Sequence, residues 1–309
     1  MTLAKVQRRL LEAGSAITAE SPDELAFQHT CLAQTCLPHR RPPDDVRRWQ
    51  RDQGRAHLLI VAGEAWHEKE QRFVEIGLPY GPKARLILMH LNSEALRQNS
   101  PLVEVESSLT AFVRRIQARP PTGPEIRAYK EQLTRLSAAM VRLAIGNGET
   151  SMQVDTKIVG AFDLWFAKDV RQRVMWPATV RLSLDYFESL KRHAVPLDER
   201  ALAALAHSAL ALDTYCWLAQ RLHRVAPAGQ FIPWTALHEQ FGQGFGLIRK
   251  FRKFFLEQLV QVCVAYPEAR LDADQRGLRL WPSPPPVSER VRAVSGSGYV
   301  QLVPPWPSA

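Results

Sequence analysis

The sequence predicts an α+β protein, mostly helical, in which two similar modules follow each other along the chain. The main observation is an element order that occurs twice: helix, strand, helix, helix, strand, strand. The length of 309 residues supports two modules, because single cores rarely grow beyond about 250–300 residues. The last segment, residues 288–309, is rich in Pro, Ser and Gly and is predicted to be a disordered tail.

Residues 1–77 are predicted to form an extension of helix and strand that packs on the first module. Within it, residues 21–34 are predicted as a helix, because their opening Ser and Pro suit the cap and the first helical position. The apolar run "HLLIVAG", residues 57–63, and the more alternating residues 68–81 predict strands. The first of these strands could close a sheet within the chain or pair with a second chain.

The first module, residues 78–195, begins at a Pro-Tyr-Gly-Pro turn. Its predicted helices and strands lie at residues 83–98, 101–106, 107–116, 123–140, 141–146 and 151–160. The second module, residues 196–287, repeats the order at residues 208–225, 229–234, 235–241 and 247–266, with a hairpin at 268–281. A helix-turn-helix followed by a β-hairpin is the order of a winged helix, so the sequence predicts two winged-helix modules in tandem.

The charge balance favours a polyanionic partner. The chain has 40 Lys and Arg against 31 Asp and Glu, a net charge of +9. Its four scattered cysteines do not suggest a disulfide framework and are typical of a reducing cytoplasm. The N-terminus lacks the pattern of a secretory signal, and the most apolar window, residues 201–219, is interrupted by polar residues and is predicted as a buried helix.

The stretch "GQGFGLIRKFRKFFLEQLVQVCVAY", residues 242–266, begins with a Gly-rich turn, becomes basic and then turns apolar. Helical spacing places one set of apolar side chains on a common face: Ile248, Phe251, Phe255, Leu259 and Val262. The cations lie away from that face or beside it: Arg249, Lys250, Arg252 and Lys253. A helix N-terminus is itself partly positive, so these cations predict a negative ligand such as DNA phosphate. A solvated charge run is the alternative.

A short helix and a turn precede this basic helix, as in the motif that delivers a recognition helix to DNA. Gln243 in the turn is a further candidate contact. The turn lacks the Gly spacing of a dinucleotide site and the Gly-Lys of a phosphate loop, so it is not predicted to bind a nucleotide. In the following hairpin, Arg276 at the tip and Arg279 on the return strand suit DNA contacts, with an exposed hairpin charge as the alternative.

The first module offers a more dilute basic surface. Its candidate contacts are, on the short helix, Arg114 and Arg115 and, on the long helix, Arg127, Lys130 and Arg135. The long helix is expected to carry its three cations away from its apolar face, with Glu125 and Glu131 among them. Weaker contacts, mainly with phosphates, are expected here.

One group of metal-ligand residue types occurs, in "HTCLAQTCLPH": His29, Cys31, Cys36 and His39. Its spacing matches no common zinc finger, and the stretch is predicted to pack inward, so no metal site is predicted. No local set of residues suggests a catalytic triad or a His-Glu-x-x-His motif. The sequence therefore predicts neither an enzyme nor a cofactor.

Three stretches together resemble the plasmid-encoded RepA-type replication initiators, over roughly residues 20–287. They are "GLPYGPKARLILMHLNSEALRQNSPLVEVESSLTAFVRRI", "WPATVRLSLDYFESLKRHAVPLDERALAALAHSALALDTYCWLAQRL" and "VCVAYPEARLDADQRGLRLWPSPPPV". The resemblance implies two winged-helix domains that bind direct repeats (iterons) at the plasmid origin. It also implies melting of adjacent AT-rich DNA, recruitment of host replication proteins such as the host initiator and the replicative helicase, and a part in copy control. It implies no use of a nucleotide.

The expected function is therefore that of a non-enzymatic, origin-binding initiator with the second module as the main DNA-binding unit. Its expected partner is double-stranded DNA in the bacterial cytoplasm, at the plasmid or nucleoid, with a homodimer possible and no membrane or small-molecule substrate. A winged-helix transcriptional regulator or autorepressor is the alternative, which dependence of the plasmid on the gene would separate. A nicking enzyme would need a metal-binding His cluster near a nucleophilic Tyr, and the sequence shows none.

Overall fold

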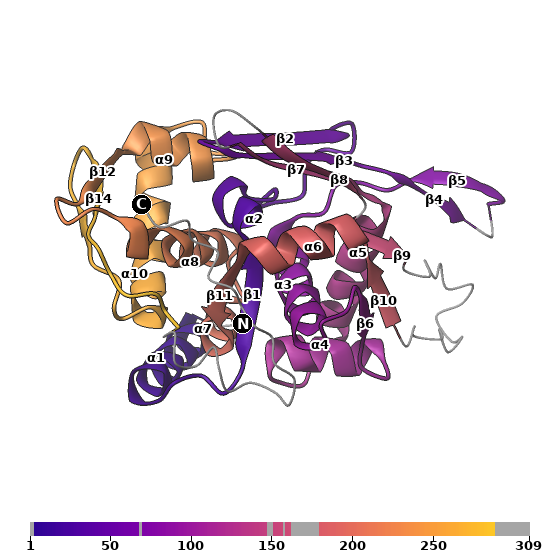
Figure 1. Cartoon of the computed structure of the whole chain (residues 1–309), viewed down its shortest axis with the longest axis horizontal. Helices are drawn as coiled ribbons and strands as arrows, with labels where there is room; N and C mark the ends of the chain where they lie inside the picture. The colour runs from indigo at the N-terminus through magenta and orange to yellow at the C-terminus, as the bar shows by residue number, and fades with distance from the viewer. Residues whose placement is uncertain (1–2, 68–69, 147–150, 157, 162–178, 288–309) are drawn as a thin grey trace.

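The structure, a computed structural model, describes residues 3–67, 70–146, 151–156, 158–161 and 179–287 (Figure 1). It is a mixed α/β fold rich in helix, as predicted. The tail predicted at residues 288–309 lies outside the described residues. None of the described helices combines the length and the apolar character needed to cross a membrane.

The helices and strands are numbered in chain order. The helices are α1 Leu3–Ala19, α2 Thr30–Thr35, α3 Gly81–Arg97, α4 Leu109–Gln117, α5 Gly123–Ala138, α6 Leu184–His193, α7 Glu199–Leu205, α8 Ala209–Arg221, α9 Trp234–Phe241 and α10 Ile248–Ala265. The strands are β1 Leu25–His29, β2 Arg48–Gln53, β3 Ala56–Val61, β4 Glu64–His67, β5 Arg72–Glu75, β6 Leu102–Glu104, β7 Met140–Gly146, β8 Ser151–Thr156, β9 Val159–Ala161, β10 Thr179–Leu182, β11 Ala194–Asp198, β12 Gln230–Pro233, β13 Leu271–Ala273 and β14 Gly277–Leu280. Helices α4, α6 and α8 start where a serine caps the first turn, at Ser108, Ser183 and Ser208.

The second module has the predicted order α8, β12, α9, α10, β13, β14. Its three strands form one antiparallel sheet in the order β12-β14-β13. Helix α8 is buried from Ala209 to Gln220, because it contacts α10 on one side and α3 of the first module on another. This explains its mostly apolar sequence, because a helix packed on several sides needs no polar face. Its buried Asp213 is paired with Arg85.

The first module has the predicted elements α3, β6, α4, α5, β7 and β8, but its sheet is paired differently. The hairpin β7–β8, predicted to form this module's wing, joins β3 rather than β6. Strand β6 instead pairs with β10, which pairs with β9. The physical reason is burial: Val141 and Leu143 on β7 lie opposite Ile60 and Leu58 on β3, and all four are buried.

The resulting four-stranded sheet has the order β2-β3-β7-β8. Strand β3, the predicted "HLLIVAG" strand, pairs with β2 along one edge and with β7 along the other. Both of its edges are therefore occupied, and it closes a sheet within the chain. The edge strands of this sheet are β2 and β8. The sequence of β2, RWQRDQ, is polar and charged, as is usual for an edge that resists aggregation.

The helix predicted over residues 21–34 is wrong in its first part. Residues Leu25–His29 form strand β1, which pairs antiparallel with β11, and only Thr30–Thr35 are helical, as α2. Strand β1 packs against α3, where the backbone N–H of Phe27 donates to Ser93 Oγ at 2.9 Å. Pairing with β11, more than 160 residues away, and cover by α3 override the local helix-start signals.

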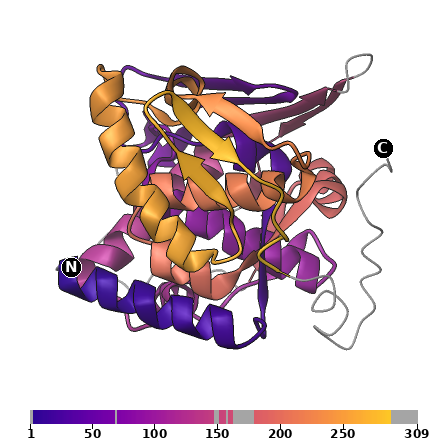
Figure 2. The same cartoon turned by 90° about the vertical axis from the view of Figure 1, so that its left-hand side faces the viewer.

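The N-terminal extension contacts both modules. Strands β2 and β3 share a sheet with β7 and β8, whereas α1 packs on α7 and on the C-terminal half of α10 (Figure 2). Gly14 makes this approach possible, because a Cβ there would lie 2.8 Å from Val264. Arg200 fixes the end of α1 by donating to the carbonyls of Ala16 and Glu20. The first helix therefore differs from the expectation that the extension packs on the first module.

Candidate nucleic-acid interface

Helix α10 is seated in the core by its aromatic side chains. Phe251 and Phe255 are fully buried and pack against His238, Trp234 and Phe241 of α9. Leu259 and Val262 continue this buried face, as predicted. Ile248, predicted on the same face, is instead 40% exposed, because the first turn of the helix extends beyond the core.

Three of the four cations at the basic end of α10 have no ion-pair partner among the described residues. Arg249, Lys250 and Lys253 are exposed, and none forms an ion pair with a residue that the structure describes. The N-cap residue, Leu247, makes no side-chain cap, and the first turn contains no acid. The N–H of Lys250 donates to the carbonyl of Leu247 at 3.0 Å. Neither the first turn nor its cations have an acidic partner within the described chain, so an anion would interact favourably with this end.

Arg252 is placed differently from its three neighbours. It is half-buried, its guanidinium lies 5.4 Å from the ring centre of Trp234, and it donates to the carbonyl of Gln275 at 3.4 Å. Gln275 belongs to the tip of the β13–β14 hairpin. Arg252 thus joins α10 to this hairpin, and part of its charge remains available at the surface.

The hairpin tip is held in a defined shape beside α10. The Asp274 carboxylate accepts hydrogen bonds from the N–H groups of Arg276 and Gly277, which lower the pKa of Asp274. Trp234 Nε1 donates to the Asp274 carbonyl at 3.0 Å. Arg276 is exposed at the tip, with its guanidinium 5.7 Å from the Phe231 ring, while Arg279 is half-buried between Phe231 and Trp281.

The turn between α9 and α10 is compact. His238 Nε2 lies 2.8 Å from the carbonyl of Phe245, and Gly242 fits only because it lacks a Cβ, which would lie 2.3 Å from His238. Gly244 has a φ of +78°, which favours glycine. The amide oxygen of Gln243, turned toward Arg51, accepts from Nε at 2.9 Å and from Nη2 at 3.1 Å. Gln243 therefore binds a residue of β2.

The candidate residues of the first module divide into two groups. Arg114 and Arg127 are exposed and Lys130 is half-buried, so these three remain available for contacts. Arg115 is instead paired with the carboxylates of Glu24 and Glu199. Arg115 was predicted to make a phosphate contact, and its two acidic partners, which come from distant parts of the chain, were not anticipated.

The prediction that Arg135 lies away from the apolar face of the long helix and contacts DNA is wrong. Arg135 is only 8% exposed. It pairs with Glu131 at 3.0 Å, donates to the carbonyl of Leu78 at 3.1 Å and lies over the Tyr80 ring. These contacts tie α5 to the turn before α3, so Arg135 supports the fold.

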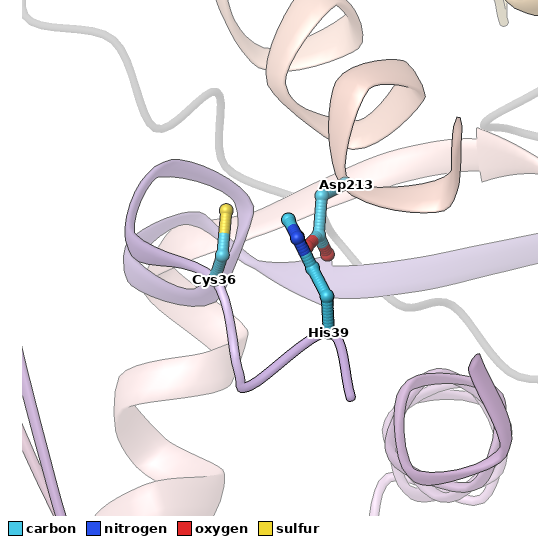
Figure 3. A group of neighbouring side chains, drawn as sticks. All are labelled: Cys36, His39 and Asp213. Carbon is cyan, nitrogen blue, oxygen red and sulfur yellow. The ribbon is translucent and has the colours of Figure 1, made fainter. Parts of the chain in front are cut away.

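The His/Cys residues of the N-terminal extension form no common cluster. His29 contacts Ser189 and Cys31 contacts the carbonyl of His57, whereas Cys36 and His39 lie beside Asp213 of α8 (Figure 3). The ligand atoms of Cys36, His39 and Asp213 lie within 4.8 Å of one another. This grouping was not visible in the sequence, because Asp213 is more than 170 residues away.

A buried arginine already neutralises this group. Arg85 of α3 is 1% exposed, and its Nε and Nη2 each lie 2.6 Å from an oxygen of Asp213. Its other N–H groups donate to the carbonyls of Leu37, Pro38 and Gly81. A cation would compete with this guanidinium for the same carboxylate, so the residues fit an ion-pair network joining α3 to α8 better than a metal site.

The pKa values agree with this description. Burial alone would raise the pKa of Asp213, but Arg85 and the hydrogen bond from His39 bring it below its usual value. Burial lowers the pKa of His39, against the opposing effect of Asp213. Burial, followed by the nearby Asp213 charge, raises the pKa of the Cys36 thiol well above its usual value. A protonated, buried thiol is a poor metal ligand and an inert nucleophile.

Two crystal structures have a similar fold, each with a TM-score of 0.50: selenomethionine derivatives of domains 2 and 3 of RctB (11% identity, covering 79% of this chain and 88% of that one) and RctB domains 2–3 (9% identity, 81% and 94%). At this identity the likeness shows the fold alone. The family model "Plasmid encoded RepA protein" matches residues 78–235. The chain therefore belongs to the plasmid-encoded RepA family, which confirms the resemblance seen in its sequence. Comparison with curated proteins found no match.

Proposed function

We propose that this protein initiates replication of its plasmid and binds duplex DNA at the origin, mainly through the basic end of α10. The observation that carries the proposal is the set of exposed cations, Arg249, Lys250 and Lys253, on a helix end that has neither cap nor acid. In this proposal the preceding α9 and turn, together with α10 and the hairpin β13–β14, act as a winged helix, and their order along the chain supports this. Membership of the RepA family supports a role in replication.

In this proposal the first two turns of α10 enter the major groove. Arg249 and Lys253, one turn apart, reach base edges or phosphates, and Arg276 at the hairpin tip contacts the neighbouring backbone. The first module adds weaker phosphate contacts through Arg114, Arg127 and Lys130. Two linked modules on one duplex raise the overall affinity through effective concentration.

The remaining steps are proposed from the family. Binding to iterons bends or kinks the DNA, which lowers the cost of opening a flexible AT-rich neighbour. Host initiator and helicase then load on the opened strands. The protein itself acts without catalysis or a cofactor, in the cytoplasm on plasmid DNA.

Fluorescence anisotropy tests the proposal, with purified protein on the duplex upstream of its gene and on a scrambled duplex, at several salt concentrations. We expect the native duplex to bind at least about a thousandfold more tightly, with a steep dependence on salt. Equal and weak binding to both duplexes would contradict the proposal. Specific binding by a protein that the plasmid does not need for replication would instead identify an autorepressor.

A further inference from the structure

The N-terminal extension brings Arg40 and Arg51 to the turn that precedes α10, and Arg55 lies at the tip of the hairpin that carries Arg51. Arg40 and Arg55 are exposed and have no ion pair within the part of the chain that the structure describes. They come from a loop and from a hairpin that lie outside both predicted winged-helix modules. Nothing in the local sequence around them resembles a DNA-binding motif.

Arg40 is fixed by contacts on either side of it. Its guanidinium lies 5.7 Å from the ring centre of Phe245, in the turn between α9 and α10. The preceding residue, His39, is anchored to the buried Asp213 at 2.9 Å. The following residue, Arg41, points elsewhere and pairs with Asp44 at 3.0 Å. Arg40 is therefore held beside the turn between α9 and α10, with its charge at the surface.

The hairpin β2–β3 is fixed to the same turn. Arg51 donates to Gln243 through two N–H groups and lies 4.4 Å from the ring centre of Trp49. The hairpin tip follows at Gly54, which has a φ of +56° and open space around it, and at Arg55, which is exposed. The carbonyl of Arg55 accepts from the N–H of Gly146 on β7, so the tip has a defined position.

A polar groove of about 350 Å³ separates this hairpin from α9. Its walls include Gln50–Gln53 of β2 and Glu239 and Gln240 of α9. Asp52 and Glu239 would repel a phosphate inside the groove. Two exposed cations lie outside the lining of the groove: Arg55 at the hairpin tip and Arg40 beside Phe245.

We propose that Arg40 and Arg55 contact phosphates of the same duplex that α10 reads, so that the N-terminal extension acts as a second wing. This inference rests on the proposed function, because it needs DNA at the basic end of α10. It adds a contact surface that the winged-helix arrangement does not contain. Two exposed arginines on separately anchored backbone segments favour contact with the regularly spaced DNA backbone over reading of bases.

The expected consequence is a contribution to affinity that is sensitive to salt and independent of sequence. Each phosphate contact adds about 1 to the slope of log K against log salt concentration. Loss of both arginines should therefore lower the slope by about 2 and weaken binding roughly three- to tenfold for each arginine. The ratio between native and scrambled duplex should stay unchanged.

The test compares the full-length variant Arg40→Ala/Arg55→Ala with a matched control, Arg41→Ala/Arg72→Ala. The control removes the same two charges, but from arginines that already pair with Asp44 and Glu70. Anisotropy titrations on the duplex upstream of the gene and on a scrambled duplex give affinity, salt slope and discrimination. Circular dichroism and thermal unfolding establish that both variants are folded.

A lower slope and affinity in the first variant only, with discrimination retained, would support the second wing. Equal slopes and affinities in the two variants would overturn it. The wild-type protein reports the proposed function separately: if it does not prefer the native duplex, the proposed function has failed. If the wild type prefers the native duplex and the two variants behave alike, only the second wing is lost.

Discussion

The two long helices α5 and α10 hold corresponding positions in their modules, but their N-terminal ends are built in opposite ways. Helix α5 begins with a capping box, in which Thr122 N–H donates to Glu125 at 2.9 Å. Glu125 is paired with Arg119, and this hydrogen bond is the largest of the effects that lower the pKa of Glu125 to about 2. Helix α10 begins with Leu247, without a side-chain cap and without an acid in its first turn.

The N-terminal end of α5 therefore has a cap and an acidic residue from its own chain, whereas the N-terminal end of α10 has neither. At α5 the orphan N–H groups and the nearest cation have internal partners. At α10 no side chain of the described residues caps the first turn, and Arg249, Lys250 and Lys253 have no ion pair among those residues. Unpaired cations at a positive helix end are unfavourable for the isolated protein, so their placement there indicates a ligand of negative charge.

The largest expected effect concerns the ion pair that joins the two modules. Asp213→Asn would leave Arg85 buried and uncompensated, which should cost about 3–5 kcal/mol in the free energy of unfolding. Urea unfolding followed by circular dichroism measures this loss. Asp44→Asn, which breaks only the exposed pair with Arg41, should stay within about 0.5 kcal/mol. A loss below 1 kcal/mol for Asp213→Asn would show that this pair does not hold the modules together.

Charge reversal on α10 and on α5 tests directly which of the two helices makes the main contact with DNA. Arg249→Glu/Lys253→Glu on α10 should weaken binding to the native duplex by at least about a hundredfold, because attraction to phosphates becomes repulsion. The matched variant on α5, Arg127→Glu/Lys130→Glu, should weaken it by less than about tenfold. Anisotropy measures both. The reverse ranking would move the main interface to the first module.

A cap transferred from α5 sharpens the comparison. Leu247→Thr/Lys250→Glu on α10 would copy the Thr-x-x-Glu pattern of Thr122 and Glu125. It should stabilise the fold by about 1 kcal/mol, since Leu247 is exposed and loses little burial. The same variant should bind DNA roughly tenfold more weakly, because it replaces a cation with an acid at the helix end that faces the phosphates. Unfolding and binding curves that both improve would contradict the proposed role of this end.

The second module could be predicted well because its signals are local. The Gly-rich turn, the buried aromatic spacing of α10 and the hairpin residues 268–281 all act over short distances, and each element lies where it was expected. In the first module the elements from α3 to β8 were also predicted, but β10, α6 and the pairing of the sheet were not. Strand partners are chosen by burial across the whole chain, and β7 meets β3 rather than β6 for that reason.

In the candidate site too, features set by local sequence were predicted, whereas features set by distant partners were not. Arg249, Lys250 and Lys253 are exposed as predicted, because helical spacing relative to Phe251 and Phe255 determines their side of the helix. Arg135 is buried, since its partner carbonyl at Leu78 is 57 residues away and leaves no mark in the local pattern. Arg40 and Arg55 were missed for a similar reason: only the fold brings Arg40, and the hairpin that carries Arg55, to the turn before α10.

The smallest expected effect is a pH dependence of the free energy of unfolding, caused by the buried His29 at the end of β1. Burial, then the nearby His193, lowers the pKa of His29 to about 3. The unfolded chain takes up a proton near pH 6.5 that the folded chain does not, so stability is full above that pH and falls below it. Between pH 7 and 6 the loss should be about 0.7 kcal/mol for this group. His29→Gln should remove this component in urea unfolding at both pH values, and an unchanged pH dependence would contradict the assignment.

The central claim is that the basic end of α10, and not its counterpart on α5, lies against the DNA. A photocrosslinking residue placed at position 250 or at position 130 tests it most directly, on the duplex upstream of the gene. We expect a strong protein–DNA adduct from position 250, which competitor duplex of the same sequence abolishes, and a weaker one from position 130. An adduct from position 130 with none from position 250 would contradict the account.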